Sequence, residues 1–93
     1  VLRADSGTGS GDVILNIPTT AAVNIPVGSA VVIVNIGTGT GNIVFTPAAG
    51  ITFLSTGTKL PAANGTGAAG ASKMVTLIKT ITNEWIAFGD LVV

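Results

Sequence analysis

The chain has 93 residues, which is enough for one domain with a modest hydrophobic core. Hydrophobic residues make up 47% of it and charged residues only 9%, and four basic residues balance four acidic ones. The scattered basic residues disfavour nucleic acid as a partner, because DNA binding requires clustered positive charge. The absence of cysteine excludes a disulfide scaffold and a cysteine-ligated zinc site. So few charges predict a surface that is covered by partners or by other copies of the chain.

The apolar composition does not predict a membrane partner. The longest purely apolar run covers residues 30–34, far short of the roughly 18 residues that a spanning helix requires. Glycine and asparagine interrupt the other apolar stretches, and we expect neither a signal peptide nor a transmembrane segment.

Residues 1–11 are interpreted as a flexible N-terminal arm, because glycine and serine dominate the second half of this segment. The tip of the arm differs in kind, since Val1, Leu2 and Arg3 are apolar or basic. An apolar and basic tip on a flexible tether predicts a segment that docks on a neighbouring molecule. The alternative interpretation is a disordered terminus without a binding role.

Residues 12–93 are interpreted as a single β-domain. Valine, isoleucine and threonine recur in short runs that are bounded by glycine, proline and asparagine, which is typical of strands and turns. No stretch carries the apolar stripe of a helix, and the prevailing residues are poor helix formers. We therefore expect an all-β fold, a small antiparallel sandwich or barrel of about seven short strands. The strands are expected at residues 13–17, 22–25, 30–36, 43–46, 51–55, 74–81 and 85–88, the last two forming a hairpin.

The strand expected at residues 30–36 is apolar on both alternating sets of side chains. Such a strand is expected to be buried on both faces, and in a domain this small the second face would meet a symmetry mate. Trp85 is a second candidate for a subunit interface, because tryptophan is enriched at binding hot spots. The alternative is that Trp85 and Phe88 both lie at the edge of one subunit's core. The predicted interface residues are Val31, Val32, Ile33, Val34 and Trp85.

Two glycine patterns are weighed and set aside. Gly-Thr-Gly recurs from Gly7, Gly37 and Gly65 without a constant period, so no internal repeat is predicted. Residues 65–70 match G-x-G-x-x-G, but a dinucleotide site requires a strand before the motif and a helix after it. Neither element is predicted there, and nucleotide binding is not expected.

A catalytic site is not predicted. Without histidine or cysteine the usual general bases and the thiol nucleophile are missing. Ser72 and Lys73 are adjacent, so on a strand their side chains would point to opposite faces. The dispersed carboxylates are interpreted as turn or strand-end residues, and they form no metal-ligand cluster. We expect no enzymatic activity, no cofactor and no metal. The carboxylates are Asp5, Asp12, Glu84 and Asp90.

The central and C-terminal parts of the chain carry recognisable sequence motifs. Residues 25–28 read Ile-Pro-Val-Gly, residues 31–35 read Val-Val-Ile-Val-Asn, and residues 39–45 read Gly-Thr-Gly-Asn-Ile-Val-Phe. Leu-Ile-Lys at 77–79 is followed by Asn-Glu-Trp at 83–85 and by Phe-Gly-Asp-Leu at 88–91. Residues 13–91 resemble a β-domain that recurs in tail-fibre and head-associated virion proteins of tailed bacteriophages. The resemblance implies a non-enzymatic virion part, often trimeric, and brings no catalytic or receptor-binding residue with it.

Among virion roles, the short chain favours a capsid decoration or cement protein on the outer capsid surface. Such a protein binds the outer shell and stabilises contacts between major capsid proteins. In this interpretation homotrimers form around residues 31–34, and the arm reaches the major capsid protein or the next subunit. The residues assigned to the capsid-binding arm are Val1, Leu2, Arg3 and Asp5.

Two alternatives remain open. The chain would also suit a tail-fibre or adhesin module that binds a host-surface glycan, in which case Trp85 and Asn83 would contact the sugar. A hydrolase that works through carboxylates is a third interpretation, for which the sequence offers no arranged residues.

Overall fold

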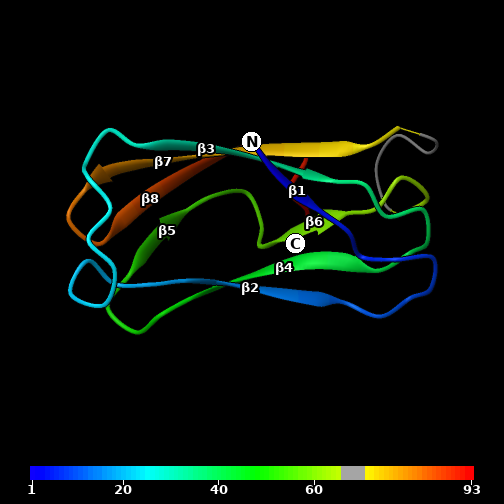
Figure 1. Cartoon of the computed structure of the whole chain (residues 1–93), viewed down its shortest axis with the longest axis horizontal. Helices are drawn as coiled ribbons and strands as arrows, with labels where there is room; N and C mark the ends of the chain where they lie inside the picture. Colours follow the sequence, from blue (N-terminus) through cyan, green and yellow to red (C-terminus); the bar gives the residue numbers. More distant parts are fainter. Residues whose placement is uncertain (66–70) are drawn as a thin grey trace.

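The protein is built from β-strands in the part of the chain that the structure describes. The computed structural model describes residues 1–65 and 71–93. Eight strands form a five-stranded sheet with the order β1-β3-β7-β8-β5 and a three-stranded sheet with the order β2-β4-β6 (Figure 1). The strands are β1 (Leu2–Ala4), β2 (Val13–Ile17), β3 (Ala30–Asn35), β4 (Asn42–Pro47), β5 (Thr52–Leu54), β6 (Lys59–Pro61), β7 (Lys73–Ile81) and β8 (Glu84–Gly89).

The prediction of an all-β fold is confirmed, but the expected antiparallel arrangement is wrong. Both sheets are mixed, since β1 pairs with β3, β2 with β4 and β5 with β8 in parallel, while the other three pairs are antiparallel. The parallel pairs β1/β3 and β2/β4 arise because the chain crosses twice from the larger sheet to the smaller one in the same direction. Within the described residues, no helix is long and apolar enough to cross a membrane.

Two segments of the chain, which we call rungs, follow the same path. The first rung (residues 2–17) runs from β1 through a glycine-rich corner to β2, and the second rung (residues 33–47) runs from β3 through a matching corner to β4. At the corner, the carbonyl oxygens of Gly7 and Gly9 each accept hydrogen bonds from two amides of the second rung, at 2.9–3.2 Å. The rungs therefore stack along their whole length, not only in their strands.

The two rungs are an internal repeat, and the prediction of no repeat is wrong for this part of the chain. Val13 pairs with Ile43, thirty positions further along, and the corner glycines have the same offset. The thirty-residue period is not constant along the rungs, because Leu2 pairs with Ile33, which is thirty-one positions away. The Gly-Thr-Gly that begins at Gly65 follows a shorter spacing again.

The segment expected as a flexible arm is instead the first half of the first rung. β1 pairs with β3, and Ser6 is buried. The Ser6 hydroxyl oxygen lies 3.1 Å from Oδ1 of Asn35, and the Ser6 amide donates to the same oxygen at 3.3 Å. The glycines of the second corner let the two corners approach closely, because a Cβ on Gly39 or Gly41 would stand 2.1 and 2.0 Å from the carbonyl oxygens of Gly9 and Gly11. The glycine-rich first segment is therefore packed against the second rung and is not a free tether.

The hydrophobic core lies between the two sheets, and Figure 1 shows β2 and β4 on one side of it with β3 and β7 on the other. The rings of Phe45 and Phe53 stack with their centroids 6.0 Å apart. Alternate residues of each strand point into this core, as the period-two pattern of a half-buried strand requires. The buried apolar residues are Ile17, Ile33, Ile43, Phe45, Leu60, Val75, Leu77, Trp85, Ala87 and Leu91.

The hairpin expected near the C-terminus is confirmed, whereas the short strand expected at residues 22–25 is wrong. β7 and β8 pair antiparallel around a turn in which Asn83 has a φ of 56°. Residues 22–25 belong to a turn, since the amides of Ala22 and Val23 both donate to the carbonyl of Thr19. The buried Lys79 ammonium of β7 donates to the Thr20 hydroxyl and the Ile25 carbonyl of this loop. These side-chain hydrogen bonds connect the loop to the sheet in place of strand pairing.

Candidate interaction surface

The outer face of the five-stranded sheet, the face turned away from the core, is largely apolar. Residues that pair across neighbouring strands project from the same face, so the registers define its rows. One row joins Arg3, Val34 and Met74, a second joins Val32, Thr76 and Phe88, and a third joins Ala30, Ile78, Ile86 and Leu54. We call these residues the outer face.

The largest side chains of the outer face are open to solvent. Met74 is 51% exposed and Phe88 is 56% exposed, and Leu54 is exposed beside them. Polar groups lie around this apolar centre, because the Thr80 hydroxyl bonds Glu84 Oε2 at 2.6 Å and Arg3 stands in the edge strand. An apolar centre with a polar rim is the usual anatomy of a protein–protein interface. Contiguous exposed apolar surface of this kind marks an interaction site more often than scattered single residues do.

The predicted subunit-interface residues divide between this face and the core. Val32 and Val34 are half-buried on the outer face, so they remain predicted interface residues. Ile33 and Trp85 are wrongly assigned, because they are only 1% and 4% exposed within their own chain. Val31 points to the same inner side as Ile33 and is half-buried. The structure therefore supports the alternative that Trp85 belongs to one subunit's core.

The four residues assigned to the capsid-binding arm lie along the first rung. Val1 is exposed, and Arg3 stands on the outer face. Leu2 instead faces inward, into a groove of about 250 Å³ that also contacts Leu15 and Ile17 of β2. Asp5 is a corner residue, since its Oδ1 accepts the Gly7 amide at 2.7 Å. We call this cavity the apolar groove; Ile25, Val31, Ile33, Leu77 and Trp85 complete its apolar lining.

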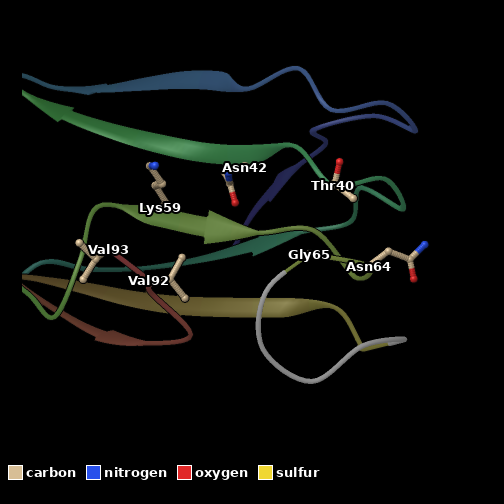
Figure 2. A pocket seen from close by; sticks show the side chains of 7 residues that line it. All are labelled: Thr40, Asn42, Lys59, Asn64, Gly65, Val92 and Val93. Atoms are coloured by element: carbon tan, nitrogen blue, oxygen red, sulfur yellow. The ribbon is translucent and has the colours of Figure 1, made fainter.

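A second pocket, of about 410 Å³, is polar. Figure 2 shows that its walls come from the corner of the second rung, from β6 with the residues that follow it, and from the C-terminus. Lys59 is the one charged side chain among the residues that line it, which are Thr40, Asn42, Lys59, Asn64, Gly65, Val92 and Val93. A lone ammonium beside amides provides no nucleophile with a general base, so this lining has no catalytic arrangement.

The carboxylates serve as acceptors for the backbone and for neighbouring side chains. Asp12 Oδ1 accepts the Asn42 amide at 2.8 Å, which ties the two rungs together at the end of their corners. Asp90 Oδ2 accepts the Met74 amide at 2.9 Å. The described residues contain no group of three acidic side chains that would hold a metal ion. These contacts agree with the interpretation of the carboxylates as turn and strand-end residues.

The structure adds little to the G-x-G-x-x-G match and to the adjacent pair Ser72 and Lys73. Residues 66–70 of the G-x-G-x-x-G match lie outside the described residues. Lys73 begins β7 and donates from Nζ to the Ala71 carbonyl at 2.7 Å, whereas Ser72 precedes the strand and is exposed. These positions do not support a Ser-Lys dyad.

The residues suggested for a glycan site are both used inside the fold. Trp85 is buried, so its ring does not form the open platform on which a sugar would stack. The Asn83 side chain accepts the Thr20 amide at 2.8 Å, and its main-chain carbonyl accepts the Thr52 amide. The glycan assignment of Trp85 and Asn83 is therefore corrected.

No family model matches this chain, and no curated protein or solved structure matches it either.

Proposed function

We propose that this chain is a non-enzymatic, self-associating structural protein, a β-sandwich-type module that acts as a capsid decoration or cement protein. In this role it binds the outer surface of a bacteriophage shell and stabilises contacts between major capsid proteins. The observation that carries the self-association is the exposed apolar outer face, on which Met74 and Phe88 are the most exposed large apolar side chains. The very low charge content supports the same conclusion, since so few charges protect a free monomer poorly.

The outer face is the proposed contact between the subunits of a homotrimer. Val32 and Val34 carry over from the sequence prediction, and Phe88, Ile78 and Ile86 extend the apolar surface across β7 and β8. Desolvating an apolar sheet face contributes roughly 25 cal/mol per Å² of apolar area removed from water. The first rung, with Val1, Leu2 and Arg3 at its start, is the proposed contact with the major capsid protein or with the next copy.

The trimer is tested by light scattering on the purified chain and on the variant Met74→Glu/Phe88→Glu. Two charges on the outer face should convert the trimer into smaller species, because burying an unpaired carboxylate is very costly. Val27→Glu is the matched control, since Val27 is as exposed as Phe88 but lies in a loop outside the outer face. An unchanged mass in the double variant would rule out the outer face as the subunit interface.

The virion role is tested separately, by quantitative mass spectrometry of virions against their major capsid protein. Many copies in a fixed ratio to the major capsid protein are the expected result for a shell-wide decoration protein. A handful of copies would indicate a fibre or tip component instead. Absence from the particle would end the virion proposal and leave the self-association to be explained in another way.

A further inference from the structure

The first rung leaves both sheets open at the same end of the molecule. β1 is the terminal strand of the five-stranded sheet, and β2 is the terminal strand of the three-stranded sheet. Because both belong to one continuous segment, the backbone from Leu2 to Ile17 pairs, among the described residues, on one side only, with the second rung. Exposed edges are usually blunted by lysine, proline or an inward-pointing charge, and the five residues of β2 include none of these.

The hydrophobic core is also uncovered at this open edge. Leu2 and Val13 share the inward side of their strands with buried Ile33 and Ile43, yet both are more than 40% exposed. The apolar groove passes between β1 and β2 and reaches Trp85. Strand edges and uncovered apolar side chains thus occur together, as they do where a sheet is extended by another strand.

The corner glycines indicate what kind of backbone fits this edge. A Cβ on Gly39 or Gly41 would stand 2.1 and 2.0 Å from the carbonyl oxygens of Gly9 and Gly11, so the second rung requires glycine where it packs on the first. A Cβ on Gly9 or Gly11 would meet nothing within 4 Å, and neither residue has a positive φ. Nothing in the described part of the chain requires glycine at these two positions. A further corner stacked on the first rung would require it.

We propose that the open edge of the first rung binds the first rung of a second copy of this chain, by backbone pairing in both sheets and closure of the apolar groove. Within the chain, a glycine corner and two strands already pack on the first rung, with the strands parallel. Between two copies the same kinds of groups would pair, with the strands antiparallel. In each copy the first rung is the rung with a free edge, which makes the contact self-complementary and twofold. When two glycine corners meet, β1 of one copy lies antiparallel to β2 of the other.

This contact uses a different surface from the outer face. Self-association through the outer face and pairing through the edge therefore combine without competing, and the edge would link one oligomer to the next. The inference deepens the proposed role of the first rung by naming its partner as another copy. It does not depend on the virion role, because it concerns association of the purified chain.

The test uses the full chain in the Met74→Glu/Phe88→Glu background, so that the outer face no longer contributes. Sedimentation equilibrium should show a monomer–dimer equilibrium in this background. Adding Gly9→Val and Gly11→Val should abolish the dimer without lowering the unfolding midpoint of the monomer, since a Cβ at either position meets nothing within 4 Å. Ser10→Val, at the exposed position between them, is the matched control and should retain the dimer.

Hydrogen exchange provides a second readout, which works in the unmodified chain as well. Amides of residues 2–4 and 13–17 should exchange more slowly as protein concentration rises, and those of β5 should not. Leu2→Lys is a second variant in case the valines disturb folding, because an inward-pointing charge on an edge strand blocks pairing. A background that stays monomeric at every concentration, or a dimer that persists in Gly9→Val/Gly11→Val or in Leu2→Lys, would overturn the proposal. A failed virion assay would leave it standing.

Discussion

The Asn35 side chain joins the first rung to the second through Ser6. Oδ1 of Asn35, which is fully buried, accepts the Ser6 amide at 3.3 Å and the Gly37 amide at 2.9 Å, and it lies 3.1 Å from the Ser6 hydroxyl oxygen. Its Nδ2 donates to the Leu60 carbonyl at 3.1 Å. One side chain therefore satisfies polar groups from both rungs and from β6, and it holds the corner that would otherwise be a loose glycine-rich loop.

Replacing Asn35 with alanine should destabilise the protein strongly. The substitution removes Oδ1, the acceptor of the buried Ser6 and Gly37 amides, and each buried unsatisfied group costs about 1–3 kcal/mol. We expect a loss of roughly 2–4 kcal/mol in the free energy of unfolding, measured by urea denaturation. Ser6→Ala removes one hydroxyl only and should cost about 1 kcal/mol. Asn24→Ala, at an exposed position, is the control, and an equal loss there would contradict the joint at Asn35.

Glycine-to-alanine substitutions should have different effects on stability at the two corners. Gly41→Ala places a Cβ 2.0 Å from the Gly11 carbonyl oxygen, so the rungs must move apart, and we expect a loss of about 2–4 kcal/mol. Gly11→Ala meets nothing and should be neutral or stabilise the monomer by up to about 1 kcal/mol, because alanine restricts the unfolded chain. Thermal unfolding of the two variants measures the difference. Similar melting temperatures would mean that the corners are not packed as described.

The strand content was predictable because it depends on local patterns. Val, Ile and Thr with period-two burial mark β7, and the turn around Asn83 marks its hairpin with β8. The outer-face positions Val32 and Val34 were predictable for the same reason, since a strand with apolar side chains on both faces is expected to pack against another surface on each face.

The parallel stacking of the rungs was not predictable from those local patterns. It depends on the pairing of residues about thirty positions apart, and the single extra residue before Gly7 shifts the register between the strands and the corner. The burial of Trp85 could not be decided from the sequence, because alternation along β8 places Trp85 and Phe88 on opposite faces without saying which face is inside. The aligned glycines at 7, 9, 11 and 37, 39, 41 are the signal that would have revealed the stack.

Lys79→Met should loosen the loop of residues 18–29. Nζ of Lys79 donates to the Thr20 hydroxyl at 2.8 Å and to the Ile25 carbonyl at 2.5 Å, and the side chain is buried. Methionine keeps the apolar stem but leaves the Ile25 carbonyl without its donor, which should cost about 1–3 kcal/mol. Amide exchange should become faster in residues 18–29 than elsewhere. Lys59→Met, on a less buried lysine, should leave that loop unchanged.

Substitutions at Asn83 should distinguish its backbone role from its side-chain role. Asn83 has a φ of 56°, a conformation that asparagine and glycine adopt readily and that costs other residues about 1–2 kcal/mol. Its Oδ1 also accepts the Thr20 amide at 2.8 Å. Asn83→Gly relieves the backbone but loses that bond, so it should destabilise by about 1 kcal/mol. Asn83→Val loses the bond and adds strain from a β-branched side chain, so we expect about 2–3 kcal/mol in urea unfolding. Equal stability of the two variants would show that the left-handed turn is not required. Interactions other than the turn at Asn83 would then have to determine the register between β7 and β8.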